Sequence, residues 1–333
     1  MNKSKLFQRL AWAATGLALV VIVAGAWVRL TDAGLGCPDW PGCYGMATWP
    51  SSAEHVDRAN AEWGHVRTVE SGKAFREMFH RYLAGFLGLV ILGLAFLAWQ
   101  NRSRPGQPVA LPMVILGLVV FQAALGMWTV TLLLKPAIVS AHLLGGMTTF
   151  GLLLWVALSS SPRAHLPSLP ARAQHAAVIA GLVVVCVQIA LGGWVSTNYA
   201  ALACTGFPTC HGEWWPDMNF AEGFRIWRGI GVDYEGGVLD EPARVAIQMA
   251  HRFWAAVVVA VMGWLVLRLW RAEDLRTLAV ATGIIVLAQI SIGIYNVVGS
   301  LPLANAVAHN GTAAVLLGVL LMLLDKTRLR GPE

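Results

Sequence analysis

Residues 82–100 read YLAGFLGLVILGLAFLAWQ, a run without a single charged side chain. A helix needs about 20 apolar residues to cross the roughly 30 Å hydrocarbon core of a bilayer. Seven further stretches have a similar length and character. The eight predicted spans are 8–28, 82–100, 111–132, 138–159, 175–196, 253–270, 277–298 and 303–324. Because these runs are continuous rather than alternating, they predict an all-α polytopic membrane protein with eight transmembrane helices.

Composition supports a membrane protein and excludes several other classes. The chain of 333 residues is 57% hydrophobic, only 13% of its residues are charged, and its mean hydropathy is +0.61. A soluble domain has about 25% charged residues. The net charge of +6 could suggest a nucleic-acid partner, but too few charges are available to cover a water-facing surface. Disorder, collagen and small disulfide scaffolds are excluded by the same numbers.

The distribution of Lys and Arg predicts the orientation in the membrane. The two termini and the loops after the second, fourth and sixth spans hold 13 of the 24 basic residues, and that side carries +9 while the other carries −3. The side richer in Lys and Arg faces the cytoplasm. We therefore expect a multi-pass protein of the bacterial cytoplasmic membrane with cytoplasmic termini. The long loops 29–81 and 197–252 would face the periplasm or outer side.

Much of the second half of the chain repeats the first half at one offset in residue number. This offset places Cys37 on Cys204, and we call it the repeat offset. The same repeat offset matches segments 24–28 and 191–195, Cys43 and Cys210, Gln122 and Gln289, and Gly126 and Gly293. The chain therefore reads as a duplicated four-helix unit, divided into residues 1–160 and 161–333. Since four spans are an even number, both copies keep one orientation, which favours a pseudo-two-fold axis along the membrane normal.

Four histidines follow the repeat and lie near the outer ends of even-numbered spans. They are His80, His142, His251 and His309. His142 and His309 match at the repeat offset, whereas His80 and His251 match at an offset four residues longer, because the second outer loop has four extra residues. Two inward-facing histidines on helices of one bundle can ligate a heme iron axially. Small residues close to each histidine on its own helix would let a macrocycle approach. Zinc is disfavoured because the spans lack an i,i+4 histidine pair. The alternative is that these side chains hydrogen-bond helix ends at the interface.

The copies differ beside the first histidine of each half. Glu77 lies three residues before His80, whereas Gln248 lies three residues before His251, and this spacing puts each pair on one helix face. A carboxylate beside a heme can accept a proton or stabilise positive charge, which an amide cannot do. This asymmetry predicts chemistry in the N-terminal half and electron storage in the C-terminal half.

Two arginines follow the histidines directly. Arg81 and Arg252 are candidate bidentate partners for heme propionates, or alternatively snorkel toward lipid headgroups. For Glu77 the structural alternative is an interfacial salt bridge with Arg76 or Arg81.

Each outer loop carries a C-x5-C pair, Cys37 with Cys43 and Cys204 with Cys210. An oxidising outer compartment favours a disulfide in each loop. A redox-active pair that passes electrons is the alternative. Zinc would need ligands from both loops, and the spacing is not C-x2-C.

Taken together, these residues resemble the heme A synthase family. The segment RLTDAGLGCPDWP at 29–41 is similar to the family's first outer-loop signature. The group Glu77-x-x-His80-Arg81, the segment from Gln122 to His142, the pair His251-Arg252 and His309 are similar to the remaining motifs. The resemblance extends from about residue 8 to 325.

The resemblance implies that the C8 methyl of heme O is oxidised by successive hydroxylations, through a geminal diol, to the formyl group of heme A for terminal oxidases. His251 and His309 would ligate a resident heme b. His80 and His142 would flank the substrate heme O, and Glu77 would act at that site. The implied partners are lipid, an electron acceptor and the farnesyltransferase that makes heme O (heme O synthase). A homo-oligomer is compatible with the sequence, and a nucleic-acid partner is not expected.

Two other functions account for part of the same pattern. A quinol-linked di-heme b cytochrome that transfers electrons would also show four histidines in a duplicated bundle. A quinone-linked thiol oxidoreductase would use the C-x5-C pairs but leaves the histidines unexplained. The difference between Glu77 and Gln248 favours the enzyme.

Overall fold

The computed structural model describes residues 3–161 and 167–329, and within them it is helical with no strand. The long helices are α1 (Lys3–Leu30), α3 (Ser71–Gln100), α4 (Ala110–Thr131), α5 (Pro136–Ser159), α7 (His175–Thr197), α9 (Glu241–Leu269), α10 (Arg276–Val298) and α11 (Leu303–Thr327). The short ones are α2 (Ala53–Trp63), α6 (Leu169–Arg172), α8 (Phe220–Gly223) and the 3-10 helix η1 (Glu273–Leu275). In the described residues, eight helical segments are long and apolar enough to cross a membrane. This confirms the predicted polytopic all-α fold.

Two helices begin earlier than the apolar runs predict. The second and sixth spans were expected at 82 and 253, but α3 begins at Ser71 and α9 at Glu241. Asp240 caps α9 by accepting a hydrogen bond from the backbone N–H of Ala243 at 3.2 Å, as N-cap residues do. The added turns bear charges that interrupt the hydropathy pattern, yet they remain helical. They pack beneath the outer loops, where Ala74 of α3 lies in a cluster with both cysteines of the first loop.

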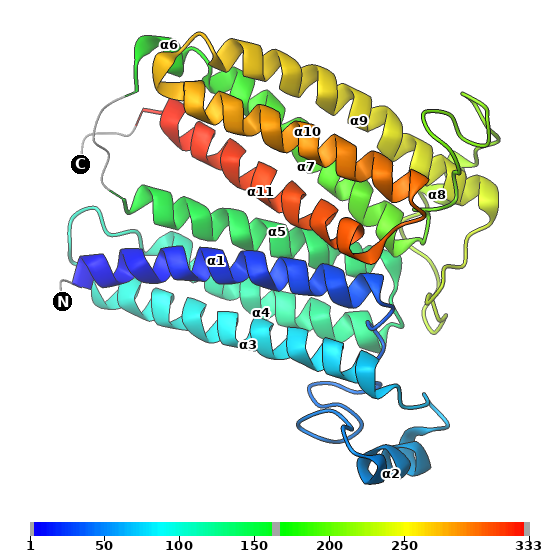
Figure 1. Cartoon of the computed structure of the whole chain (residues 1–333). Helices are drawn as coiled ribbons and strands as arrows, with labels where there is room; N and C mark the ends of the chain where they lie inside the picture. The colour runs from blue at the N-terminus through cyan, green and yellow to red at the C-terminus, as the bar shows by residue number, and fades with distance from the viewer. Residues whose placement is uncertain (1–2, 162–166, 330–333) are drawn as a thin grey trace.

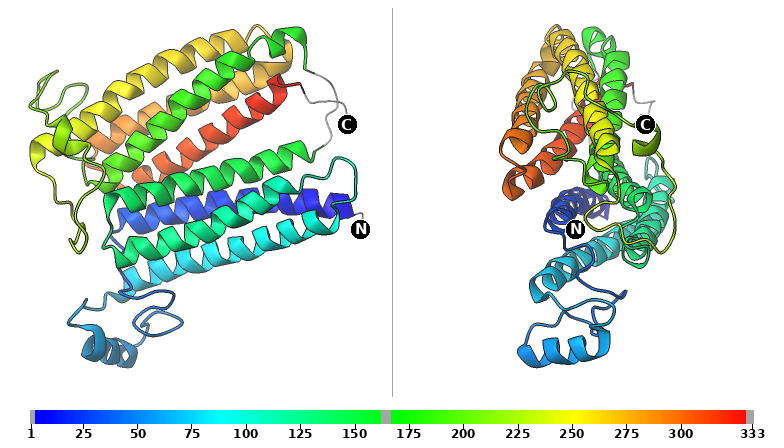
Figure 2. Two further views of the ribbon diagram at one scale, coloured as in Figure 1. Left: turned by 180° about the vertical axis from the view of Figure 1, so that it is seen from behind. Right: turned by 90° about the vertical axis from the view of Figure 1, so that its right-hand side faces the viewer.

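The long helices form two four-helix bundles (Figure 1). Neighbours follow the order α1, α3, α4, α5 around the first bundle and α7, α9, α10, α11 around the second. Each bundle has its own apolar core, one including Phe7, Ile91 and Leu153 and the other including Met262 and Leu320. The bundles meet through α1 and α5 on one side and α7 and α11 on the other, as the end-on view in Figure 2 shows. Helices α3 and α5, and likewise α9 and α11, are therefore diagonal partners.

Local backbone features recur at the repeat offset of the sequence. Non-glycine residues with positive φ include Asp32 with its repeat counterpart Tyr199, and Tyr44 with its repeat counterpart His211. An isolated bridge joins Cys43 to Met46 in the first half and Cys210 to Glu213 in the second. The cysteine-bearing segments of the two outer loops thus share local backbone features as well as sequence.

The start of α1 and the end of α11 lie at the end of the molecule opposite the cysteine loops. Helix α1 begins and α11 ends at one end, whereas the loops with α2 and α8 project from the other (Figure 1). Arg163, Arg330 and Glu333, which contribute to the predicted charge asymmetry, lie outside the described residues.

Candidate functional site

The four histidines lie in two pairs, one in each bundle. His80 is on α3 and His142 on the diagonal helix α5, while His251 is on α9 and His309 on the diagonal helix α11. The ring nitrogen Nδ1 of all four is buried. Each bundle therefore presents two histidines to its interior from opposite helices, which is the arrangement that holds a heme between axial ligands.

A glycine on the adjacent helix lies against each histidine ring. A Cβ at these glycines would lie 3.0 Å from His80 Cε1 (Gly25 of α1), 3.4 Å from His142 Cε1 (Gly126 of α4), 3.1 Å from His251 Cε1 (Gly192 of α7) and 3.0 Å from His309 Cε1 (Gly293 of α10). At Gly25, Gly192 and Gly293 a larger residue would force the ring to move, whereas at Gly126 the added Cβ would only touch the ring. Small residues had been expected on the helix of each histidine, so these facing glycines were missed. The sequence could have revealed them, because Gly25 and Gly192, and likewise Gly126 and Gly293, recur at the repeat offset.

The histidines leave ring nitrogens without partners. Nδ1 of all four is buried and has no hydrogen-bond partner among the described residues. Nε2 of His251 lies 3.3 Å from the amide nitrogen of Gln188, and Nε2 of His309 lies 3.3 Å from that of Gln289. A buried polar atom without a partner is costly, so these rings remain available to a bound group that engages their nitrogens. The donor set therefore fits a heme group in each half.

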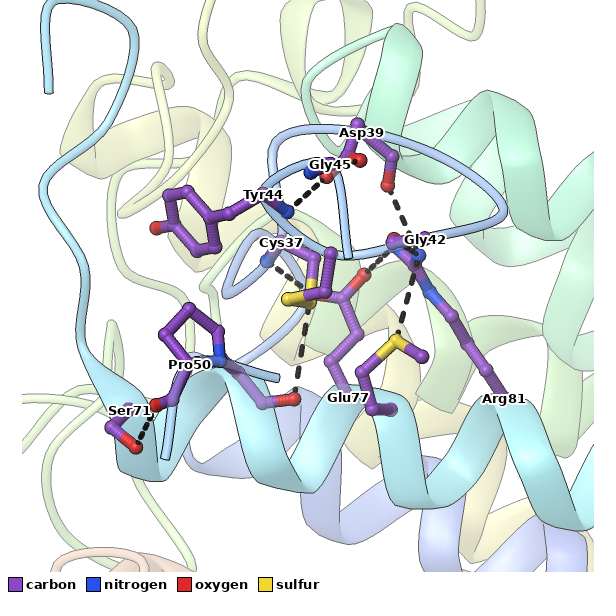
Figure 3. The surroundings of a disulfide bond; sticks show 12 residues. Cys37, Asp39, Gly42, Tyr44, Gly45, Pro50, Ser71, Glu77 and Arg81 are labelled. Atoms are coloured by element: carbon purple, nitrogen blue, oxygen red, sulfur yellow. Dashed lines mark hydrogen bonds and ion pairs between the residues drawn. A yellow bond between two sulfur atoms is a disulfide. The ribbon is translucent and has the colours of Figure 1, made fainter. Parts of the chain in front are cut away.

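Glu77 is engaged by the first cysteine loop (Figure 3). Its side chain is buried; Oε2 accepts a hydrogen bond from the Cys37 backbone N–H at 2.8 Å, and Oε1 forms an ion pair with Arg81 at 2.5 Å. Gly36 permits this approach, because a Cβ there would lie 2.6 Å from the carbonyl carbon of Lys73 in α3. Of the two salt bridges that the sequence left open for Glu77, the structure shows the one with Arg81.

The two arginines that follow the histidines hold the cysteine loops. Nη1 of Arg81 donates to the carbonyl oxygens of Asp39 at 3.0 Å and Gly42 at 2.5 Å. Nη2 of Arg252 donates to Cys204 O at 2.8 Å, and its Nη1 donates to Thr209 O at 3.2 Å. The sequence left heme propionates and lipid headgroups open as their partners, and neither alternative is tested by these contacts. The structure shows both guanidinium groups on loop carbonyls.

Both predicted disulfides are present. Cys37 is bonded to Cys43 and Cys204 to Cys210, with Cα–Cα distances of 4.7 and 5.0 Å. The first disulfide packs with Met78 and the second with Met249, at matched positions of α3 and α9. Each disulfide thus closes a compact loop on the outer turns of the helix that carries a histidine.

The second outer loop also reaches across the N-terminal half, which the sequence did not reveal. Arg67 of the first loop forms ion pairs with Glu235 at 2.7 Å and Asp233 at 3.5 Å. Between these two acids, the backbone N–H of Tyr234 donates to Leu133 O at 3.0 Å. The two halves are therefore joined above the N-terminal histidine pair as well as through their helices.

Tyr44 gives the first loop a dependence on alkaline pH. Burial raises the pKa of Tyr44 from 10.0 to about 12, although nearby Arg67 lowers it. The unfolded chain loses this proton first, so between pH 10 and 12 it binds fewer protons than the folded chain and stability falls as pH rises. We expect Tyr44→Phe to flatten this alkaline decline in an unfolding titration.

The same substitution removes the hydrogen bond from the Tyr44 hydroxyl to Thr68 O. The free energy of unfolding at neutral pH should therefore fall by about 1 kcal/mol. The alkaline decline of each protein is measured relative to its own stability at neutral pH. Parallel alkaline curves for the parent and Tyr44→Phe would show that Tyr44 does not contribute to the decline.

The chain is similar to proteins of one family along nearly its whole length. The family COX15-CtaA, described as cytochrome oxidase assembly protein, matches residues 8–321. A heme A synthase of Shewanella oneidensis is 44% identical over 301 residues, which are 90% of this chain and 90% of that one. A heme A synthase of Symbiobacterium thermophilum is 30% identical over 329 residues, covering 95% and 94%. One of Rhizorhabdus wittichii is 29% identical over 322 residues, covering 92% and 89%.

Proposed function

This chain belongs to the COX15-CtaA family of cytochrome oxidase assembly proteins, and we propose that it is the enzyme that oxidises heme O to heme A. The product serves terminal oxidases. The oxidised group is the C8 methyl, which two successive hydroxylations convert to a formyl group.

The assignment of different roles to the two halves rests on one observation. Each bundle holds a diagonal histidine pair, but only the N-terminal one has a buried carboxylate, Glu77, one turn outward on the face of its first histidine, His80. At the matched place the C-terminal bundle has Gln248, whose buried Oε1 has no hydrogen-bond partner among the described residues. A negative charge buried next to the histidine pair suits oxidation, since such a charge stabilises a developing positive one; the buried Asp325 of the C-terminal bundle lies instead at the far end of α11. Residues 1–160 would therefore form the substrate half and residues 161–333 the cofactor half.

The histidines would hold two tetrapyrroles with different roles. His251 and His309 would ligate heme b, which supplies electron-transfer chemistry when bound. His80 and His142 would flank the substrate heme O. Support for both assignments comes from the unpartnered ring nitrogens and the glycines that face each ring.

The outer loops prepare the substrate half. Arg81 fixes the first loop through three backbone carbonyls and fixes Glu77 through an ion pair. Glu77 is thereby held in one position as the negative charge at the substrate site. The disulfide between Cys37 and Cys43 would keep the loop closed over that site and limit the access of water.

The enzyme would work in the bacterial cytoplasmic membrane with its cysteine loops on the periplasmic side. Its substrate is lipophilic, so heme O would arrive within the bilayer from the farnesyltransferase that makes it. An electron acceptor would complete the oxidation. The cysteine loops lie at the end opposite the start of α1 and the end of α11 (Figure 1), which supports this topology together with the excess of Lys and Arg near the termini.

Production of heme A in a host that makes heme O but lacks heme A tests the proposed function. We expect aerobic expression of this chain to convert a large part of the heme O in the pigment extract to heme A. Expression of His80→Ala, which removes one histidine of the substrate half, is the matched inactive control.

The absence of heme A from aerobic cells that contain the folded protein would contradict the proposal. A purified protein that holds two low-spin hemes reducible by quinol, with heme O unchanged, would instead support a di-heme b cytochrome.

A further inference from the structure

The N-terminal half contains a buried cation whose charge no described residue balances. Lys135, the residue before α5, is 1% exposed, and its Nζ has no hydrogen-bond partner among the described residues. Its ammonium group lies 3.4 Å from the ring centroid of Trp227, which belongs to the second outer loop. A desolvated ammonium without an anion is expensive. Its burial therefore points to a negatively charged ligand.

A second cation lies on the diagonal helix. Arg76 of α3 has a buried Nε without a hydrogen-bond partner in the described part of the chain, and no ion pair is found for it there. Its guanidinium is 5.9 Å from the ring of Trp27. By contrast, Arg81 and Arg252 are occupied by loop carbonyls. Lys135 is buried and Arg76 is half-buried, and neither forms an ion pair with a described residue, so the charge of each can pair with that of a ligand.

Both cations lie outward of the N-terminal histidine pair. Arg76 precedes His80 by four residues and Lys135 precedes His142 by seven, so they lie about one and two helical turns away, on the same faces as the histidines. Two turns correspond to about 10 Å along the helix axis. That distance is similar to the distance between the iron of a porphyrin and the carboxylates of its propionate groups.

The matched positions of the C-terminal half carry no charge. At the repeat offset Lys135 corresponds to Pro302, and at the spacing of the first histidines Arg76 corresponds to Ile247. Ile247 is fully buried. The two cations are therefore a property of one half only, the same half that carries Glu77.

We propose that Lys135 and Arg76 bind the two propionate carboxylates of the tetrapyrrole substrate in the N-terminal half. The inference rests on the proposed function and specifies how its substrate is oriented. With its propionates held on the outer side, the macrocycle has one orientation between His80 and His142. Trp227 covers Lys135 from the second outer loop, which keeps water from the ammonium and strengthens its attraction for a carboxylate.

Binding of iron protoporphyrin and of its dimethyl ester tests this inference. The ester keeps the iron and the ring but has no negative charges. Each compound is titrated into the full-length protein in phosphatidylcholine nanodiscs, with the C-terminal half already loaded with heme. Binding is followed by absorbance, and His80→Ala identifies the signal of the N-terminal half. We expect the parent protein to bind the free acid about tenfold or more tightly than the ester.

Substitutions then show which residues cause the preference for the free acid over the ester. Lys135→Met should lose most of it, and Lys135→Arg should keep it, since the charge is retained. Arg76→Met should lose part of it. Lys73→Met is the matched control, because Lys73 lies on the same outer turns of α3 but is paired with Glu70 at 2.8 Å; it should leave the preference unchanged.

The outcomes separate this inference from the proposed function. Equal affinities for acid and ester, or a preference that survives Lys135→Met, would overturn the inference and leave the function standing. If phosphatidylglycerol in the nanodisc abolishes the preference, the anion at Lys135 is a lipid phosphate and the inference is again overturned. If no second heme binds to the N-terminal half, both fail.

Discussion

Alanine at His251 or His309 should abolish the low-spin heme spectrum of the C-terminal half. Each imidazole would supply one of two axial bonds, so the loss of either leaves the iron with a single protein ligand. The adjacent side chains cannot replace it. Gln188 and Gln289 approach the histidines through amide nitrogens, and an amide is a poor ligand for heme iron. We therefore expect the purified variants to lose most of the bound heme b.

His175→Ala is the matched control for these variants. His175 begins α7 in the same half, and its Nδ1 is 2.9 Å from the Thr327 hydroxyl, at the end of the bundle opposite the cysteine loops. It should keep the spectrum and the thermal stability of the parent within about 1 kcal/mol. His80→Ala should keep the spectrum too, because it changes the other bundle. A complete low-spin spectrum in both His251→Ala and His309→Ala would refute the ligand assignment.

The sequence predicted the membrane fold because its signal is long and repeated. Eight apolar runs predicted the long helices, and the sequence repeat predicted a duplicated four-helix unit. The helix starts at Ser71 and Glu241 were missed because their first turns are polar. Those turns are stabilised by the loops packed on them, and packing between distant segments leaves no trace in local hydropathy.

The candidate site was predicted in its residues but not in all of their contacts. The histidine pairs follow from the repeat, since equivalent positions of equivalent bundles face equivalent interiors. The contacts of Arg81 and Arg252 with loop carbonyls do not follow from it, because a guanidinium group can donate to a carboxylate or to a backbone carbonyl. Lys135 escaped notice for a related reason. Its burial depends on Trp227, which lies far along the chain in the other half.

Replacing Glu77 with glutamine should leave heme in both halves and lower the conversion of heme O by about 100-fold or more. The amide oxygen can still accept the hydrogen bond from Cys37, so the loop keeps one of its two attachments to this side chain. What disappears is the negative charge. Glu77 is 4% exposed, so water cannot replace that charge in stabilising a positive one. Conversion is measured as heme A formed per bound heme O.

Two variants distinguish this role from simple support of the loop. Arg81→Met removes the ion pair with Glu77 and the contacts to loop carbonyls but leaves the carboxylate. Glu77→Gln also removes the ion pair, but it leaves Arg81 on the loop carbonyls and removes the carboxylate. If Glu77 acts through its charge, Arg81→Met should retain much more conversion than Glu77→Gln, and Glu77→Asp should restore part of it. Gln248→Glu, the matched change in the other half, should not rescue Glu77→Gln. Equal losses in Arg81→Met and Glu77→Gln would instead mean that Glu77 only holds the loop, since the loop is the structure that both variants weaken.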